Sequence, residues 1–415
     1  MTAAPIRRYR ECPGCGMGQQ IPELTPGMTA ACRQCGTALL RTARHGLNQS
    51  VALVFAALVL LVVMSTNAMM SVSTSGIEHS AYLLSGPAEL VERNMAMLAV
   101  VVTLVTLVIP FVRLTGLLYV LLSLRQVKLP ADLNRIFALT ERLRPWSMVE
   151  VFVFGVFVAY VKLGDLVRIT LDPGVYALLA LTFVLIWADS SLDREAVWER
   201  IAPEKTGPDP SGKLVGCEVC GHTDVPRPPD ARCARCLSRV HHRKPDSLSR
   251  TWALLIASVV LYIPANYYPV LTIVQLGAGT PATIIGGVEE LLSSGLYPLA
   301  ALVFFASVAV PMLKMVGLAV MLVAVQAGRT EWLRDRTRMY YLIRGVGRWS
   351  MIDIFMESLL GALVKFGTVV TIEPGMGAVA FCGVVILTML AAEAFDPRLM
   401  WDAAGRREAI VPQMI

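Results

Sequence analysis

The chain has 415 residues, of which 55% are hydrophobic and 16% are charged, and its formal net charge is +6 at pH 7. A soluble globular protein of this length would carry about a quarter charged residues, so the composition excludes that class and indicates an integral membrane protein. The net charge does not indicate a nucleic-acid-binding protein, because most of the cations fall in polar segments between apolar runs.

The first 45 residues are polar and cysteine-rich, so a cleavable signal peptide is not expected. Cys12 and Cys15 form one CxxC pair, and Cys32 and Cys35 form a second pair after a gap of 16 residues. Each CxxC turn directs two thiolates at one ion, and two such turns complete a tetrahedral set of four sulfurs. The segment therefore predicts a small metal-binding ribbon.

Eight apolar runs follow, and each is long enough to be a membrane-spanning helix, since about 20 residues cross a bilayer. They cover residues 51–70, 96–122, 147–167, 175–190, 252–272, 297–325, 350–370 and 376–394. The expected fold class is an all-α polytopic membrane protein. Residues 203–216, rich in Pro, Gly and charge, form the expected linker between the fourth and fifth runs.

A second cysteine cluster follows the linker. Cys217 and Cys220 precede Cys233 and Cys236 by 12 residues, and glycine follows three of the four CxxC pairs in the chain. Cytoplasmic thiols stay reduced, so the repeated pattern favours two structural zinc sites, with iron as the competing metal. Thiol redox chemistry is one alternative, and replacement of a cysteine ligand by His222 or His241 is another.

The distribution of Lys and Arg predicts the orientation in the membrane. Of the 37 Lys and Arg residues, 31 lie in the N-terminus, the 123–146 loop, the 191–250 segment, the 326–349 loop and the C-terminal tail. The alternate loops are acidic or neutral. Since cytoplasmic loops carry excess Lys and Arg, both termini and the central linker are expected in the cytoplasm.

The two halves of the chain repeat each other at an offset of roughly 201–205 residues. RPWSMVEVF at 144–152 matches GRWSMIDIF at 347–355, and IPFVRLTGLL at 109–118 matches VPMLKMVGLA at 310–319. Each half contains one cysteine cluster and four apolar runs. An even number of crossings makes the repeats parallel, related by an axis along the membrane normal.

A zinc ribbon followed by four membrane helices, twice over, resembles the paraquat-inducible protein A family, which includes the LetA proteins. The resemblance covers essentially the whole chain and rests on the CxxC sets, PANYYPV at 264–270, RPWSM and GRWSM. It implies an inner-membrane partner of a mammalian-cell-entry (MCE) protein. Such proteins form hexameric tunnels that carry lipids between the two membranes of a Gram-negative envelope.

Ionisable residues inside the apolar runs are the expected transport residues, because buried charge in a membrane usually faces the bundle interior. Arg113 and Lys314 each lie three residues after a proline, and Glu150 and Asp353 occupy equivalent positions of the two halves. Arg113 is expected to approach Glu150, and Lys314 to approach Asp353 or Glu357, which share a helix face. Static ion pairs within each four-helix unit are the alternative.

Lys162 in YVKLGD and Lys365 in LVKFGT occupy equivalent positions near the far end of their runs. Lys162 shares a face with Asp165, whose counterpart is Thr368. Together with the family resemblance, this predicts a polar cleft that handles the phosphate of a lipid headgroup. The alternative is that the lysines extend their ammonium groups to the periplasmic headgroups.

Two functional classes remain. The first is a lipid transporter or loader that serves a periplasmic tunnel and supports the cell envelope; the second is a passive scaffold that docks the tunnel. An enzyme is not expected, because common ATP-binding, metalloprotease and serine-hydrolase motifs are missing from the sequence. The expected domains are a zinc ribbon (1–46), a membrane module (47–202), the linker with the second ribbon (203–246), and a second module with a cytoplasmic tail (247–415).

The charge distribution yields a direct topology prediction. Reporters fused after residue 45, within 203–216 or after residue 402 should give a cytoplasmic signal, and reporters in 76–90 or 275–290 a periplasmic one. A periplasmic signal from the linker would contradict the parallel repeat, since each half then crosses an odd number of times.

Overall fold

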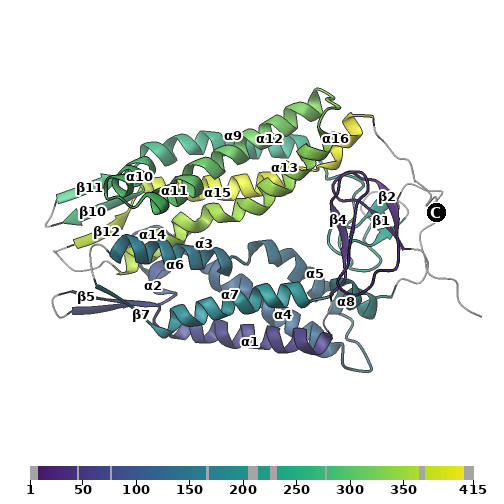
Figure 1. Ribbon diagram of the computed structural model, residues 1–415, viewed down its shortest axis with the longest axis horizontal. Helices are drawn as coiled ribbons and strands as arrows, with labels where there is room; N and C mark the ends of the chain where they lie inside the picture. Colours follow the sequence, from purple (N-terminus) through teal and green to yellow (C-terminus); the bar gives the residue numbers. More distant parts are fainter. Residues whose placement is uncertain are drawn as a thin grey trace, which may run out of the picture.

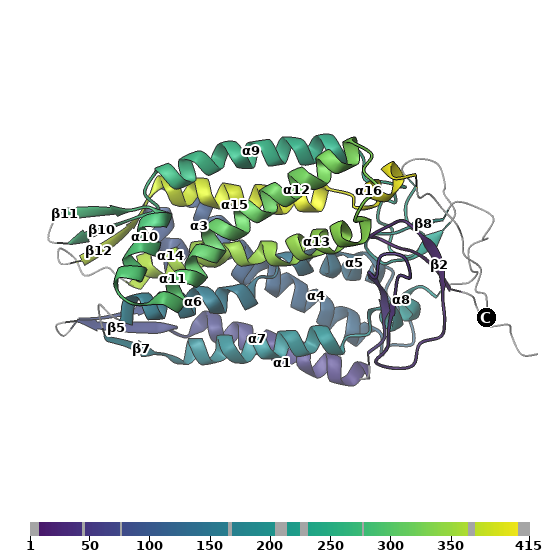
Figure 2. The same ribbon diagram turned by 45° about the horizontal axis from the view of Figure 1, so that its top comes forward.

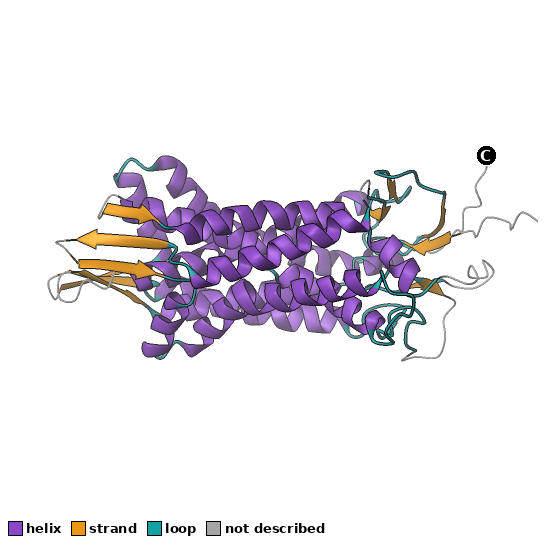
Figure 3. Cartoon of the chain, turned by 90° about the horizontal axis from the view of Figure 1, so that it is seen from below, coloured by secondary structure: helices purple, strands orange, loops and turns teal. Residues whose placement is uncertain are grey.

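The structure is a computed structural model, and it describes residues 8–43, 46–74, 77–164, 168–203, 214–224, 231–275, 278–363 and 370–405. Helices form a long bundle, and strands lie at its two ends (Figure 3). One end, here called the ribbon end, carries the cysteine clusters, and the other, the sheet end, carries two small sheets (Figure 1). We call residues 8–203 the first half and residues 214–405 the second half.

The helices of the first half match the expected order of spans, with shorter helices between them. They are α1 (Leu47–Thr66), α2 (Ser85–Glu92), α3 (Ala96–Thr103), η1 (Leu104–Val108), α4 (Ile109–Ser123), α5 (Leu133–Leu143), η2 (Arg144–Trp146), α6 (Val149–Gly164), α7 (Pro173–Ser191) and α8 (Arg194–Ile201).

The second half repeats this order. Its helices are α9 (Ser247–Tyr267), α10 (Ile284–Ser293), α11 (Tyr297–Phe304), η3 (Phe305–Ala309), α12 (Val310–Gln326), α13 (Leu333–Val346), η4 (Gly347–Met351), α14 (Ile352–Leu363), α15 (Met376–Ala394) and α16 (Arg398–Ala403). Figure 2 shows α9, α12 and α15 together on one side of the bundle and α1, α4 and α7 on the other.

Seven helices in the described part of the chain are long and apolar enough to cross a membrane. They are Leu47–Thr66, Ala96–Ser123, Leu133–Gly164, Pro173–Ser191, Ser247–Tyr267, Tyr297–Gln326 and Met376–Ala394. The eighth expected span, 350–370, is described as far as Leu363, and its remainder lies outside the described residues. The prediction of a mostly helical, multi-pass membrane protein is confirmed.

A helix occupies part of each of the two segments that the sequence had assigned to basic loops, 123–146 and 326–349. α5 and α13 lie within 123–146 and 326–349, and each buries an apolar face that includes Leu133 and Phe137 in α5 and Leu333 and Tyr340 in α13. Local charge suggested loops, but apolar residues spaced three or four apart favour amphipathic helices. Both helices lead directly into the following spans.

A π-helical turn precedes a proline that occupies the same repeat position in each half. η1 ends at Val108, two residues before Pro110, and η3 ends at Ala309, two residues before Pro311. Proline lacks an N–H and its ring clashes with the carbonyl four residues earlier, so a wider turn before it accommodates the ring without ending the helix. Arg113 and Lys314 therefore occupy equivalent positions in the second span of each half, three residues after the proline.

Each half also forms an antiparallel three-stranded sheet at the sheet end, which the sequence analysis did not anticipate. The strands are β5 (Met70–Thr74), β6 (Ile77–Ala81), β7 (Arg168–Leu171), β10 (Leu271–Gln275), β11 (Ala278–Ala282) and β12 (Val370–Pro374). Their orders are β6-β5-β7 and β11-β10-β12. The central strand, β5 or β10, follows the first span of its half. The edge strand β7 or β12 follows the third span, so each sheet connects the ends of the first and third spans.

The ribbon end contains short hairpins from both halves. The strands are β1 (Arg8–Glu11), β2 (Gly18–Ile21), β3 (Thr29–Ala31), β4 (Ala38–Arg41), β8 (Val215–Gly216) and β9 (Thr223–Asp224), and a bridge joins Arg232 to Arg239. The two ribbons contact each other, since the backbone N–H of Glu11 donates to Thr223 Oγ1 at 3.1 Å. They form one layer over the helices.

Equivalent residues of the two halves meet where α6 packs against α14. Phe152 and Phe355, which match in the repeat, lie edge to face with ring centroids 5.4 Å apart. Gly155 permits this approach, because a Cβ atom at Gly155 would lie 2.7 Å from the Cβ of Phe355. Contact between equivalent residues is the geometry expected of parallel repeats about a shared axis.

Candidate functional site: cysteine clusters and polar cavities

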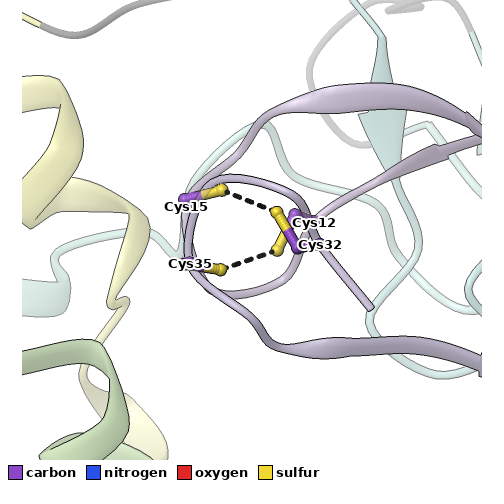
Figure 4. A group of neighbouring side chains, drawn as sticks. All are labelled: Cys12, Cys15, Cys32 and Cys35. Atoms are coloured by element: carbon purple, nitrogen blue, oxygen red, sulfur yellow. Dashed lines mark hydrogen bonds between the residues drawn. The ribbon is translucent and has the colours of Figure 1, made fainter. Parts of the chain in front are cut away.

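The eight predicted cysteines form two buried clusters of four (Figure 4 shows the first). In each cluster the sulfur atoms lie within 4.8 Å of one another. The Sγ atoms of Cys12 and Cys35 are 3.4 Å apart, and those of Cys15 and Cys32 are 3.6 Å apart. A disulfide requires about 2.05 Å, so the thiols are free and arranged as a metal-binding set.

All four CxxC turns share one backbone geometry. In the first cluster, Gly16 N–H donates to the Cys12 carbonyl at 2.8 Å and Gly36 N–H to the Cys32 carbonyl at 2.9 Å. Both glycines have the positive φ that such a turn requires, and Leu237 takes the same position in the fourth turn with φ 60°. The predicted tight turns are confirmed.

Within each cluster, hydrogen bonding among the thiols lowers the pKa of two cysteines, and hydrogen bonding together with burial raises the pKa of the other two. Interactions led by Cys12 lower the pKa of Cys35 to about 7, and interactions led by Cys217 lower the pKa of Cys233 to about 6. Backbone N–H groups of Gly14 and Arg235 also donate to cluster sulfurs at 3.4 Å. Thiolates are the form that binds metal, so both clusters can each hold one ion.

Each cysteine cluster contacts helices of the opposite half. The first cluster packs in one apolar cluster with Tyr340, Phe395 and Trp401 of the second half. The second ribbon contacts the first half, where Asn134 Nδ2 donates to the Arg235 carbonyl at 3.0 Å. The two halves are therefore joined crosswise at the ribbon end.

A buried carboxylate ties both ribbons to α8. Glu195 Oε1 accepts from Arg10 Nη2 at 2.6 Å and from Arg235 Nη1 at 2.8 Å. All three side chains are at most 10% exposed. Removing one member of such a buried set leaves uncompensated charge, so the attachment of the ribbons depends on Glu195.

A cavity of about 570 Å³ lies beneath the ribbons, between the two halves. We call it the ribbon-end cavity. Its charged lining residues come from the first ribbon, α4, α6, α7, α12, α13, α15 and the turns before α6 and α14, and are Arg41, Arg113, Arg144, Glu150, Asp189, Lys314, Arg344, Arg348 and Glu393.

The predicted pairing of Arg113 with Glu150 is wrong. Arg113 Nη2 donates to Asp189 Oδ1, and Glu150 lines the same cavity without being the ion-pair partner. Arg144 and Arg194 approach the same carboxylate at 3.6 and 3.5 Å. Asp189 lies at the end of an apolar run, and that lone carboxylate was the sequence signal for this site.

The predicted approach of Lys314 to Asp353 or Glu357 is also wrong. Lys314 is 1% exposed, and its Nζ atom donates to Thr388 Oγ1 at 3.0 Å and to the Gly347 carbonyl at 3.4 Å. The residue at the repeat position of Asp189 is Ala392, so the second half offers Lys314 no equivalent carboxylate.

A second, smaller cavity of about 40 Å³ lies near the sheet end. Lys162, Asp353, Glu357 and Ser307 are among its lining residues, and we call it the sheet-end cavity. Asp353 and Glu357 share a helix face, as predicted, but they face Lys162 of the other half. Among the described residues, Asp353 Oδ1 is buried without a hydrogen-bond partner.

Three predicted site residues cannot be placed in this geometry. Asp165, Lys365 and Thr368 lie outside the described residues. The role that the sequence gave to Asp165, a carboxylate near Lys162, is also available to Asp353 and Glu357, which line the sheet-end cavity with Lys162.

The family model for paraquat-inducible protein A matches residues 47–202 and 248–405. The chain is also 35% identical over 407 residues to the intermembrane transport protein PqiA of Escherichia coli (strain K12). This alignment covers 96% of each of the two chains. The chain belongs to the paraquat-inducible protein A family. The predicted family resemblance is confirmed.

Two further relatives have names that refer to the cell envelope or to transport between membranes. The lipophilic envelope-spanning tunnel protein A of Escherichia coli (strain K12) is 30% identical over 96% of this chain and 92% of its own length. A probable intermembrane transport protein of Haemophilus influenzae is 26% identical over 98% of this chain and 99% of its own length. These names describe transport proteins, not enzymes. No solved structure matches the chain.

The cysteine geometry of this family member predicts its metal content. Purified protein should hold two metal ions per chain, and replacing both Cys217 and Cys220 with Ser should remove one ion and leave the other, because each cluster is a separate set of four sulfurs. Elemental analysis against protein concentration measures this, with Cys382→Ser as the control. A wild-type preparation with free thiols, no metal and unchanged stability would contradict the prediction.

Proposed function

We propose that the protein is an inner-membrane lipid transporter or loader that passes phospholipid to or from a periplasm-spanning MCE tunnel. The names of relatives that align along nearly the whole chain support an intermembrane transport role. The observation that carries the proposal is the sheet-end cavity, where Lys162, Asp353 and Glu357 line one space within the helical bundle. Ionisable groups at such positions usually serve a transported substrate or ion.

In this proposal Lys162 binds the phosphate of a phospholipid headgroup. Asp353 and Glu357, on α14, line the same cavity and attract the ammonium when no lipid is bound. An arriving phosphate competes with these carboxylates, so binding is weak enough for release. The orphaned acceptor on Asp353 supports this role, because a buried polar atom without a partner marks a strained or functional position.

The sheet-end cavity is too small for a headgroup in this conformation. Its volume of about 40 Å³ holds only a few water molecules, since each needs roughly 10–15 Å³ of such space. Ile284, Gly287 and Leu291 of α10 line the cavity opposite α14. We therefore propose that the described conformation is closed, and that displacement of α10 from α14 admits the lipid.

The alternative is a passive anchor that docks the tunnel. The two three-stranded sheets at the sheet end support it, because they extend beyond the helices where a periplasmic partner would sit (Figure 1). A scaffold needs no ionisable residues between its halves, however, and an apolar cluster would cost less to insert in the membrane. The buried charges therefore favour transport.

The proposal extends to location, partners and metal. Both termini and the ribbon end lie in the cytoplasm, the sheet end lies in the periplasm, and the partner is a hexameric MCE protein. The two cysteine clusters hold structural zinc, which four sulfur ligands leave without an open position. The domains divide at 46, 202 and 246, with a zinc ribbon before each membrane module.

The central test replaces Lys162. Lys162→Ala should insert normally yet lose complementation of an envelope-stress phenotype, because the phosphate loses its cation, and photo-crosslinking from position 162 should capture phospholipid. Phe157→Ala is the control, since this side chain lies on the same helix and is 54% exposed. Full complementation by Lys162→Ala at normal expression would remove the transport role and favour the scaffold.

A further inference from the structure

The ribbon-end cavity carries more positive charge than its carboxylates neutralise. Six of its lining residues are Lys or Arg and three are Asp or Glu, which leaves an excess of three positive charges. Charges of one sign in a confined space raise the local potential for a ligand of the opposite sign. The sheet-end cavity, with one lysine and two carboxylates, has no such excess.

One of the three carboxylates in the ribbon-end cavity, Asp189, is already shared. It accepts from Arg113 and also pairs with Arg144 at 3.6 Å and with Arg194 at 3.5 Å, although Arg194 lies outside the lining and pairs more closely with Glu141 at 3.0 Å. One carboxylate offers fewer acceptor sites than Arg113 and Arg144 offer donors, so donors remain for a further anion. Each guanidinium has five N–H donors and can bind one phosphate through two of them at once.

The remaining cations in the cavity have no carboxylate partner. Within the described ranges, Arg41, Arg344 and Arg348 make no ion pair, and Lys314 is held by a hydroxyl and a carbonyl only. A fully buried ammonium with only neutral partners is costly, and an anion would stabilise it. Together these cations come from the first ribbon and from both halves.

Part of the uncharged lining is apolar and reaches the outer surface of the bundle. Leu185 and Ile186 of α7 and Met389 of α15 line the cavity, and Ile186 is 51% exposed. Trp187 beside it is 54% exposed, and exposed tryptophan is typical of the membrane interface. A volume of about 570 Å³ lies within the range of small-molecule sites, roughly 300–1,000 Å³.

We propose that the ribbon-end cavity is a binding site for a phosphate-bearing anion, either a phospholipid headgroup or a soluble phosphate ester. Arg344 and Arg348 bind the phosphate at the entrance, and Lys314 and Arg113 bind it deeper in the bundle. The site shares no lining residue with the sheet-end cavity, so it does not rest on the proposed function of Lys162.

Binding to the purified full-length chain tests the proposal, with short-chain phosphatidylglycerol and glycerol 3-phosphate as separate probes. Arg344→Gln/Arg348→Gln should weaken binding about tenfold or more, since hydrogen bonds to charged groups contribute about 1.5–3 kcal/mol each. Arg336→Gln/Arg338→Gln removes the same charge from α13 outside the cavity and should bind as the wild type does.

The two probes identify the source of the phosphate. Binding of the lipid alone identifies a headgroup site, and equal binding of glycerol 3-phosphate identifies a soluble ester; either result supports the site if the Arg344/Arg348 variant weakens it. Equal affinity of that variant and its control overturns it. Loss of lipid binding in Lys162→Ala but not in the Arg344/Arg348 variant places the lipid at the sheet end, which overturns this proposal and leaves the proposed function standing.

Discussion

Lys162, Asp353 and Glu357 bring charge into the interior of a membrane bundle, where an isolated charge costs a few kcal/mol to insert. The cost falls when opposite charges face one another, and here they line one cavity from different halves of the chain. The charges therefore favour packing of α6 against α14, and Gly155 leaves room for that contact. Most other features of the fold are consistent with this central contact.

The ribbons reinforce the same arrangement from one end. The first cysteine cluster packs on the second half, and the second ribbon contacts the first half, so neither half completes its own core at the ribbon end. Glu195 adds a charged link to both ribbons. Metal binding at either cluster would consequently stabilise contacts between halves as well as the local turns.

The sequence predicted features that depend on local spacing. The CxxC turns and the apolar runs are recognised from neighbouring residues, and the repeat is recognised from a comparison within the chain. The cysteine clusters and the described spans agree with these predictions. Partners across the bundle were not predictable in this way: Arg113 contacts Asp189 on α7, and Lys162 faces carboxylates some 190 positions later in the chain. The sheets at the sheet end were missed because their strands have five residues or fewer, and because in each sheet one strand follows the other two only after two intervening spans.

Lys162 and the carboxylates of the second half line one cavity, and a double-mutant cycle measures most directly whether their charges interact. Lys162→Met, Asp353→Asn and the double variant are compared by thermal unfolding of purified protein in one detergent. If opposite charges join the halves, the double variant loses clearly less stability than the sum of the single losses, by about 0.5–3 kcal/mol. Losses that simply add would contradict a charged contact between the halves.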